Sequence, residues 1–256
     1  KIPNAFSIIH TTKLCGAGVA YLLAQEIKNV ILRRSRRISG SFASAQDDNG
    51  KGNTHLELVA LATIADLVPL TGANRTLVKF GIEKLRETKR PGLLALIEET
   101  EIEKELIDIY EIGHVIAPRL NAMGRLEYAM DSLRLLCTKD FKRAEILATK
   151  LGSTNKRRQE LTIEAFEHAR LKITNLKSKI PNLLFIAHES YQQGVIGLVA
   201  GRLVEEFYRP AIVLSIGEKY SKASARSISG FNMIEFIRTA SDLLVDVGGH
   251  PMAAGF

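Results

Sequence analysis

The chain has 256 residues, of which 46% are hydrophobic and 25% are charged, a balance typical of an ordinary globular protein. This composition excludes a disordered chain and a fibrous protein. Thirty-five Lys and Arg residues against 28 Asp and Glu residues leave a formal net charge of +7. Such a charge favours a polyanionic partner such as nucleic acid, although solubility alone also explains it.

The cysteine and hydropathy patterns indicate a cytoplasmic protein. The two cysteines, Cys15 and Cys137, are too far apart for a disulfide framework or a zinc cluster, which favours a reducing compartment. The longest apolar run, residues 58–65, is far shorter than the roughly 20 residues of a membrane span. The N-terminus has no signal-peptide pattern and no initiator Met, so we interpret Lys1 as lying inside a larger protein.

The first 53 residues predict an α/β unit followed by an insertion. Residues 6–9 form an apolar strand, and the glycines at 16 and 18 then lead into an amphipathic helix ending near Leu32. These glycines could expose backbone N–H groups to phosphate or simply allow close helix packing. Residues 33–53 carry four arginines and almost no apolar periodicity, which predicts a disordered insertion, either solvated or in contact with nucleic acid.

Asp66 is the most informative acid of the next segment. It lies near the end of the apolar stretch at residues 56–70, and burial of an uncompensated carboxylate is costly. We therefore expect Asp66 to pair with a cation, to cap a helix or to bind a metal ion.

The segment up to residue 126 predicts packing helices and one polar loop. Asn74 can cap a helix at residues 75–87, Pro91 suits the first turn of a helix at 92–99, and residues 101–110 are helix-like. Arg119, Asn121 and Arg125 then crowd beside Pro118 and Gly124, which favours a rigid anion-binding loop because guanidinium groups match phosphate oxygens. Structural ion pairs are the alternative.

A long helix and a second α/β unit complete the chain. The helix is capped by Thr138 and runs to about Lys177, with a possible break at Gly152, and its basic residues 156–158 face either a groove or solvent. Strands at 183–187 and 211–216 flank a helix at 195–207. A polar strand from Ser224 to Ser227 and a helix capped by Asn232 precede Gly248, Gly249 and His250. His250 could donate to a phosphate or act in acid–base chemistry, or it is an ordinary turn histidine.

Six ordered motifs carry a resemblance to a known family. They are residues 14–20, 62–70 with Asn74 and Arg75, 118–125, 194–197 with 200–202, 224–227, and 248–255. Over nearly the whole chain, this pattern resembles the RecJ single-stranded-DNA exonucleases of the DHH phosphoesterase superfamily.

The resemblance implies an α/β fold of two lobes joined by a long helix. It assigns residues 1–137 to part of a DHH domain, 138–178 to the connecting helix and 179–256 to a DHHA1 domain. The implied activity is metal-dependent 5′-to-3′ hydrolysis of single-stranded DNA in repair and recombination, with Mn²⁺ or Mg²⁺ as cofactor.

The resemblance also implies roles for individual residues. Asp66 occupies a metal-binding position, and His250 joins it among the catalytic residues. The implied substrate contacts are Arg119, Asn121, Arg125, Ser224, Arg226, Ser227, Gly248, Gly249 and His250.

The departures from the family pattern limit the expected activity. The Asp-His-His motif and the other N-terminal aspartates of the family are absent, and one aspartate cannot hold two divalent cations, so we expect the isolated chain to be inactive or nearly so. Two alternatives remain. One is a non-catalytic nucleic-acid-binding fragment, and the other is a DHH phosphodiesterase acting on short oligonucleotides or cyclic dinucleotides.

Overall fold

The computed structural model describes residues 55–176 and 180–256, together with Cys15, Ala17, Ala20 and Leu23. The predicted strand at residues 6–9 and the predicted insertion at 33–53 lie outside the described residues. The chain divides into two compact units, one of Lys1–Leu120 with Ser132–Thr149 and the other of Asn121–Asp131 with Lys150–Phe256. Helices and a single described sheet together confirm the predicted α/β class.

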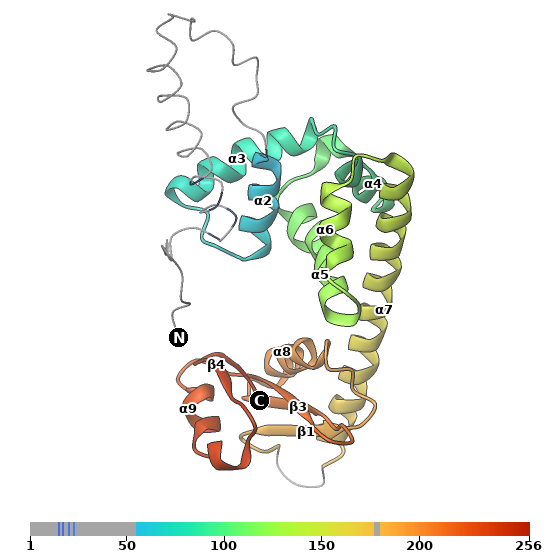
Figure 1. Ribbon diagram of the computed structural model, residues 1–256. Coiled ribbons are helices and arrows are strands. Elements are labelled where there is room, and N and C mark those ends of the chain that lie inside the picture. Colours follow the sequence, from blue (N-terminus) through green and yellow to red (C-terminus); the bar gives the residue numbers. More distant parts are fainter. Residues whose placement is uncertain (1–14, 16, 18–19, 21–22, 24–54, 177–179) are drawn as a thin grey trace, which may run out of the picture. The chain divides into compact units, whose positions relative to one another are not determined.

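The described chain is helical up to residue 174 (Figure 1). In order, the elements are α2 (Leu56–Ala65), α3 (Gly72–Arg86), α4 (Pro91–Glu99), the 3₁₀ turn η2 (Lys104–Leu106), the π-helix η3 (Glu111–Ile116), α5 (Ala117–Leu126), α6 (Met130–Cys137) and α7 (Phe141–Thr174). In the first unit, α3 crosses α2 so closely that a Cβ on Gly81 would lie 2.5 Å from the Cβ of Ala60. The core of this unit is formed by apolar residues that are almost fully buried, among them Leu85, Leu96, Ile112 and Leu135.

The second unit contains a five-stranded mixed sheet. Its strands are β1 (Leu184–His188), β2 (Ala211–Ser215), β3 (Lys222–Arg226), β4 (Gly248–His250) and β5 (Ala253–Gly255), in the order β1-β2-β3-β5-β4. β1 and β2 are parallel because α8 (Ile196–Phe207) connects them, and the other pairs are antiparallel. α9 (Met233–Arg238) and the 3₁₀ turn η4 (Ser241–Leu243) lie between β3 and β4.

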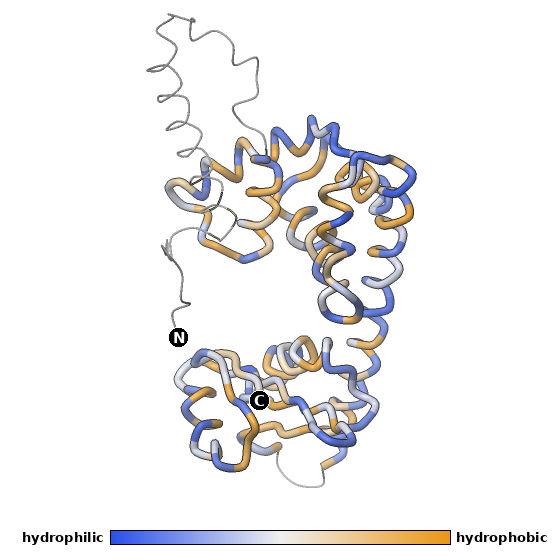
Figure 2. Tube along the Cα trace, viewed as in Figure 1, coloured by the Kyte–Doolittle hydropathy of each residue, from blue (hydrophilic) through white to orange (hydrophobic). Residues whose placement is uncertain are grey.

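Two apolar clusters cover the two faces of this sheet. One joins α7 and α8 to β1 and β2 through residues such as Ala169, Val199, Leu203 and Val213. The other joins α9 to the sheet, with Met233 packed among residues of β2, β3 and β5. Apolar residues accordingly dominate β1 and β2, whereas polar and apolar residues alternate along α7 (Figure 2).

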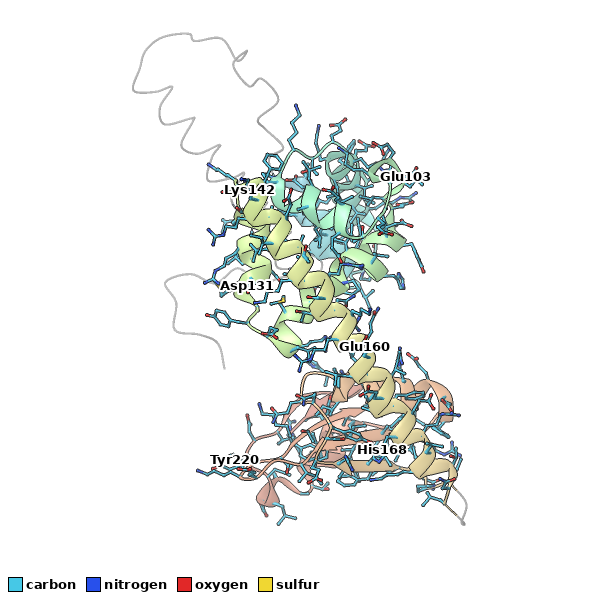
Figure 3. All side chains as sticks on the ribbon, turned by 90° about the vertical axis from the view of Figure 1, so that its right-hand side faces the viewer. Glu103, Asp131, Lys142, Glu160, His168 and Tyr220 are labelled. Carbon is cyan, nitrogen blue, oxygen red and sulfur yellow. The ribbon has the colours of Figure 1, made fainter. Side chains whose placement is uncertain are left out.

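Most elements of the second unit lie where the sequence predicts them. The strands expected at 183–187 and 211–216 are β1 and β2, and the helix expected at 195–207 is α8. Asn232 caps α9, since its side chain accepts a hydrogen bond from the backbone N–H of Glu235. α7 is continuous, and Figure 3 marks Glu160 and His168 along it. The expected break at Gly152 is wrong.

Three predictions of local structure need correction in the first half of the chain. Residues 118–125 are not a loop but part of α5, because Pro118 lies in the first turn of that helix, where its missing N–H costs little. α3 begins at Gly72 after Thr71, so Asn74 is inside the helix and does not cap it. The helix-like stretch at 101–110 contains the short turn η2, and its last two residues, Ile109 and Tyr110, are helical directly before η3.

The cap of α7 also differs from the prediction. The helix begins at Phe141, and the side chain of Asp140 accepts a hydrogen bond of 3.0 Å from the backbone N–H of Arg143. Thr138 instead accepts a hydrogen bond from the backbone N–H of Asp140. Pro91 does stand at the first position of α4, as the sequence predicts.

Candidate functional site

Four arginines of the second unit lie close together, although they come from four different elements. Arg125 belongs to α5, Arg158 to α7, Arg202 to α8 and Arg226 to β3. Burial, and then the charges of Arg125 and Arg202, lower the pKa of Arg158. Burial, and then the charge of Arg125, lower the pKa of Arg226. Charge effects of this kind act at short range, so Arg125 lies near both Arg158 and Arg226, and Arg202 lies near Arg158; we call these four residues the arginine cluster.

Ser224 and Arg226 form one side of the arginine cluster. They are two residues apart on β3 and therefore point to the same face of the sheet. The Nη1 group of Arg226 donates to Oγ of Ser224 at 3.1 Å and to the backbone oxygen of Ala225 at 2.8 Å. These two bonds hold the guanidinium in place while Nε and Nη2 stay available to a ligand.

Two glycines near the start of α8 make room for this arrangement. A Cβ on Gly197 would lie 2.9 Å from Oγ of Ser224 and 3.0 Å from Nη2 of Arg226. A Cβ on Gly194 would overlap the backbone oxygen of Arg125, so the two backbones touch at this point. The Nη1 group of Arg125 donates to the backbone oxygen of Gly194 at 3.3 Å. A side chain at Gly194 would thus meet backbone atoms, whereas one at Gly197 would displace the side chains of Ser224 and Arg226.

The arginine cluster carries positive charge that no acidic side chain offsets. In the part of the chain that the structure describes, none of the four arginines forms an ion pair with a carboxylate. Guanidinium groups present several donors in a planar fork that matches phosphate oxygens. The arrangement is therefore suited to binding an anion with several oxygen atoms.

The other predicted substrate contacts of the loop and strand regions have different surroundings. Arg119 belongs to the first unit, where its Nε donates to Glu99 at 2.5 Å and its Nη1 to the backbone oxygen of Val115 at 3.0 Å. Asn121 is exposed. Ser227 is buried, and its hydroxyl donates to the backbone oxygen of Phe231 at 2.6 Å. The structure thus brings Arg125, Ser224 and Arg226 together, and gives Arg119 and Ser227 structural partners.

The predicted residues Gly248, Gly249 and His250 form the edge strand β4. His250 is exposed and pairs with Ala253 of β5 in an antiparallel ladder. Gly249 has a φ of +149°, and a Cβ there would lie 2.5 Å from the Cα of Ala254. Only glycine therefore fits this tight hairpin, which holds the imidazole of His250 at the sheet edge.

Asp66 directly follows α2 and is exposed. Asp66 therefore does not carry the cost of burial from which pairing, capping or metal binding is expected, because the chain leaves the helix at this point and the next residue, Leu67, is 87% exposed. No group of three His, Cys, Asp or Glu side chains that could hold a metal ion occurs among the described residues. The described residues do not fit a two-metal centre.

Sequence reasoning missed Arg158 and Arg202 as members of the cluster. Arg158 was grouped with Lys156 and Arg157, but those two side chains are exposed, whereas Arg158 is half-buried. The helical period provides the signal, since Asn155 and Thr162 are buried and lie three and four residues away on the same face. Arg202 stands in one of the quoted motifs, after Ala200 and Gly201.

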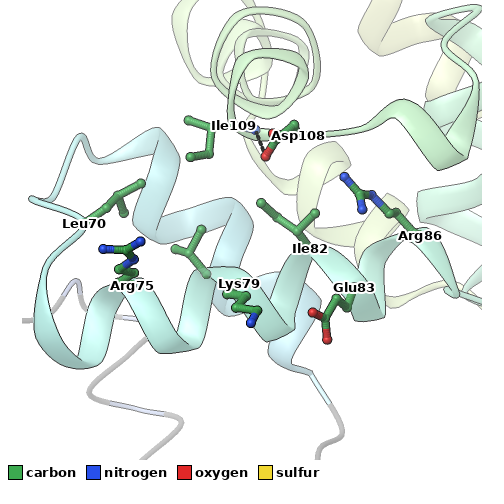
Figure 4. Close-up of a pocket in the computed structure, with 9 residues that line it drawn as sticks. Leu70, Arg75, Lys79, Ile82, Glu83, Arg86, Asp108 and Ile109 are labelled. Carbon is green, nitrogen blue, oxygen red and sulfur yellow. Dashed lines mark hydrogen bonds between the residues drawn. The ribbon is translucent and has the colours of Figure 1, made fainter.

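A pocket of about 480 Å³ in the first unit is less suited to an anion. It lies along α3, and its lining includes the apolar residues Val78 and Ile82 and the basic residues Arg75, Lys79 and Arg86. Figure 4 shows the pocket. The carboxylates of Glu83 and Asp108 also line it. Arg86 already donates from Nε to the backbone oxygen of Ile107 at 2.9 Å.

Comparisons with known proteins agree with the motif pattern. A model of the DHHA1 domain matches residues 179–256. The single-stranded-DNA-specific exonuclease RecJ of Bacillus subtilis is 42% identical over 266 residues, covering 100% of this chain and 31% of that protein.

Solved structures of RecJ proteins are also similar to this chain. The crystal structure of an exonuclease RecJ bound to manganese superposes with a TM-score of 0.76 at 31% identity, covering 98% of this chain and 58% of the other. The crystal structure of RecJ from Thermus thermophilus in complex with Mg²⁺ gives a TM-score of 0.70 at 35% identity, covering 79% of this chain and 31% of the other.

The chain spans less than half the length of the curated RecJ proteins that it matches. The divalent ions in the solved structures support metal use by these relatives. No helix in the described ranges is long and apolar enough to cross a membrane. Over its full length the chain is therefore similar to a segment of RecJ proteins, and residues 179–256 match the DHHA1 domain.

Proposed function

We propose that the chain serves in 5′-to-3′ hydrolysis of single-stranded DNA, and that its described residues contribute the binding of the strand. The observation that carries this proposal is the arginine cluster, in which Arg125 lies near Arg226 and, among the described residues, neither forms an ion pair with a carboxylate. Phosphate groups of a DNA backbone supply the missing negative charge. The names of the relatives supply the substrate class, since they are single-stranded-DNA-specific exonucleases.

Within this proposal, three residues bind the strand from the second unit. Arg125 and Arg226 donate to phosphate oxygens, and Ser224 fixes the orientation of the Arg226 guanidinium through the 3.1 Å hydrogen bond. His250 lies on the tight β4–β5 hairpin. Its imidazole donates a hydrogen bond to an oxygen atom whose negative charge grows in the transition state. Phosphate contacts of this kind position a strand without reading its bases, so binding is independent of sequence.

A divalent metal ion supplies the hydrolytic chemistry in this family when it is bound. We propose Asp66 as one of its ligands. A single exposed carboxylate does not bind Mg²⁺ or Mn²⁺ tightly, so Asp66 acts only together with ligands from beyond the described residues. Binding and hydrolysis are accordingly tested separately.

The experiment is a titration of oligonucleotides with the chain at several salt concentrations. We expect single-stranded DNA to bind, and Arg125→Ala and Arg226→Ala each to lower the slope of log affinity against log salt by about 0.7, the value for one phosphate contact on a single strand. Unchanged slopes for both variants would make these arginines structural. Release of nucleotides from the 5′ end with Mn²⁺ is measured in parallel. We expect little or no release by this chain alone, and any release that Asp66→Asn leaves unaffected contradicts the proposed metal ligand.

A further inference from the structure

The side chain of Arg158 has a buried donor without a partner. Its Nε is inaccessible to solvent and forms no hydrogen bond among the described residues. A buried polar group without a partner costs free energy, and a charged one costs more. A fold retains such a group when a ligand satisfies it or when the cost is tolerated for another reason.

The rest of the guanidinium is held in a fixed orientation. Nη2 of Arg158 donates to Oδ1 of Asn155 at 2.8 Å, one helical turn earlier on α7. Asn155 is itself only 4% exposed, so its amide cannot move freely and the guanidinium is held with it. The side chain is therefore oriented before any ligand arrives.

Two positive charges act on Arg158. Burial, and then the charges of Arg125 and Arg202, lower its pKa. Arg202 in turn lies over the ring of Phe166, with its Cζ 5.8 Å from the ring centroid. An oriented guanidinium among like charges is suited to bind an anion, not a neutral ligand.

We infer that Arg158 is a further phosphate-contacting residue and that Asn155 positions it. This inference rests on the proposed function, because the anion is taken to be the backbone phosphate of single-stranded DNA. It adds a residue of the long helix α7 to a site otherwise made by α5 and β3. The strand therefore contacts α7 at Arg158 as well as β3 at Arg226.

The chain offers a matched control in the adjacent residue. Arg157 is on the same helix, carries the same charge and is exposed. Arg157→Gln and Arg158→Gln therefore change the net charge equally, and any difference between them reports the location of the side chain. Asn155→Ala keeps all charges and removes only the orienting hydrogen bond.

The test is titration of a single-stranded oligonucleotide with the full chain, at several salt concentrations. Arg158→Gln is expected to weaken binding about tenfold, the lower range for a charged hydrogen bond, and to reduce the salt slope by about 0.7. Arg157→Gln should change affinity less than about threefold. Asn155→Ala should weaken binding while keeping the salt slope.

Stability gives an independent readout. Without DNA, Arg158→Gln should melt at the same temperature or higher, because it removes a like charge and a buried unpaired donor. If this variant does not fold, Arg158→Lys keeps the charge and lacks Nε, and it should retain the salt slope with weaker binding.

The outcomes separate the inference from the proposed function. If Arg158→Gln and Arg157→Gln bind alike while Arg226→Ala binds more weakly, Arg158 is not a phosphate contact and the proposed function stands. If Arg226→Ala and Arg125→Ala also bind as the unmodified chain does, the arginine cluster is not the DNA site and both proposals fail.

Discussion

Replacement of Gly197 by Ala should damage the DNA site without damaging the fold. The added Cβ would lie 2.9 Å from Oγ of Ser224 and 3.0 Å from Nη2 of Arg226. Both atoms belong to side chains that can rotate away, so the helix itself accepts the methyl group. Gly201, four residues later on α8, has no atom within 4 Å of its own added Cβ and provides the matched control.

The two substitutions are expected to differ in stability by a known amount. Gly→Ala inside a helix stabilises by about 1 kcal/mol, which Gly201→Ala should show in full as a rise in melting temperature of about 3 °C. Gly197→Ala gains the same and loses the hydrogen bond between Arg226 and Ser224, which contributes about 1 kcal/mol. Its net change should therefore be close to zero.

The affinity for single-stranded DNA should also differ between the two variants. A displaced Arg226 guanidinium loses a charged hydrogen bond to phosphate, so Gly197→Ala should bind single-stranded DNA about tenfold more weakly, equivalent to about 1.4 kcal/mol. Gly201→Ala should bind as the unmodified chain does. In an Arg226→Gln background the effect of Gly197→Ala should shrink, because both changes act on one interaction. Equal affinity of the two alanine variants would refute the reasoning.

Two further predictions concern residues outside the arginine cluster. Arg119→Ala should lower the free energy of unfolding by about 2 kcal/mol, because it leaves the partly buried carboxylate of Glu99 unpaired. Denaturant titration measures this loss, and we expect the affinity of the folded protein for DNA to change less than about threefold, since Nε and Nη1 are already engaged; a tenfold loss would restore Arg119 as a DNA contact. Burial, and then the charges of Lys172 and His188, lower the pKa of His168 in the folded chain. Because the folded pKa lies below the unfolded value of about 6.5, this contribution to stability is complete above that pH and is lost as the pH falls through the folded pKa. His168→Gln should flatten the dependence of melting temperature on pH, and an unchanged profile would assign it to other groups.

The second unit could be predicted well from the sequence because its signals are local. β1 and β2 are apolar runs bounded by Pro or Gly, as expected for buried parallel strands, and they lie within about one residue of their predicted positions. Asn232 carries a capping side chain directly before α9. In each case the residues that predict the helix or strand lie in it or directly beside it, and the same residues stabilise it.

The predictions failed where one local sequence pattern is compatible with two different structures. Pro118 and Gly124 were interpreted as loop residues, but Pro is equally compatible with the first turn of a helix, and α5 contains both. The apolar neighbours of Asp66 suggest a costly burial of its carboxylate, yet Asp66 is exposed and the next residue, Leu67, has a positive φ of 53°. Apolar neighbours in sequence do not determine exposure at the end of a helix.

Prediction of the arginine cluster requires both the sequence pattern and knowledge of the folded structure. Its β3 members follow from alternation along a strand, which places Ser224 and Arg226 on one face. Arg158 follows from the helical period only once its neighbours Asn155 and Thr162 are known to be buried, since the sequence alone does not distinguish it from Arg157. That these residues meet depends on Gly194 and Gly197, where the absence of a side chain lets α8 approach α5 and β3. The glycines of the motif are thus the sequence feature that encodes the site, because they determine where the charges converge.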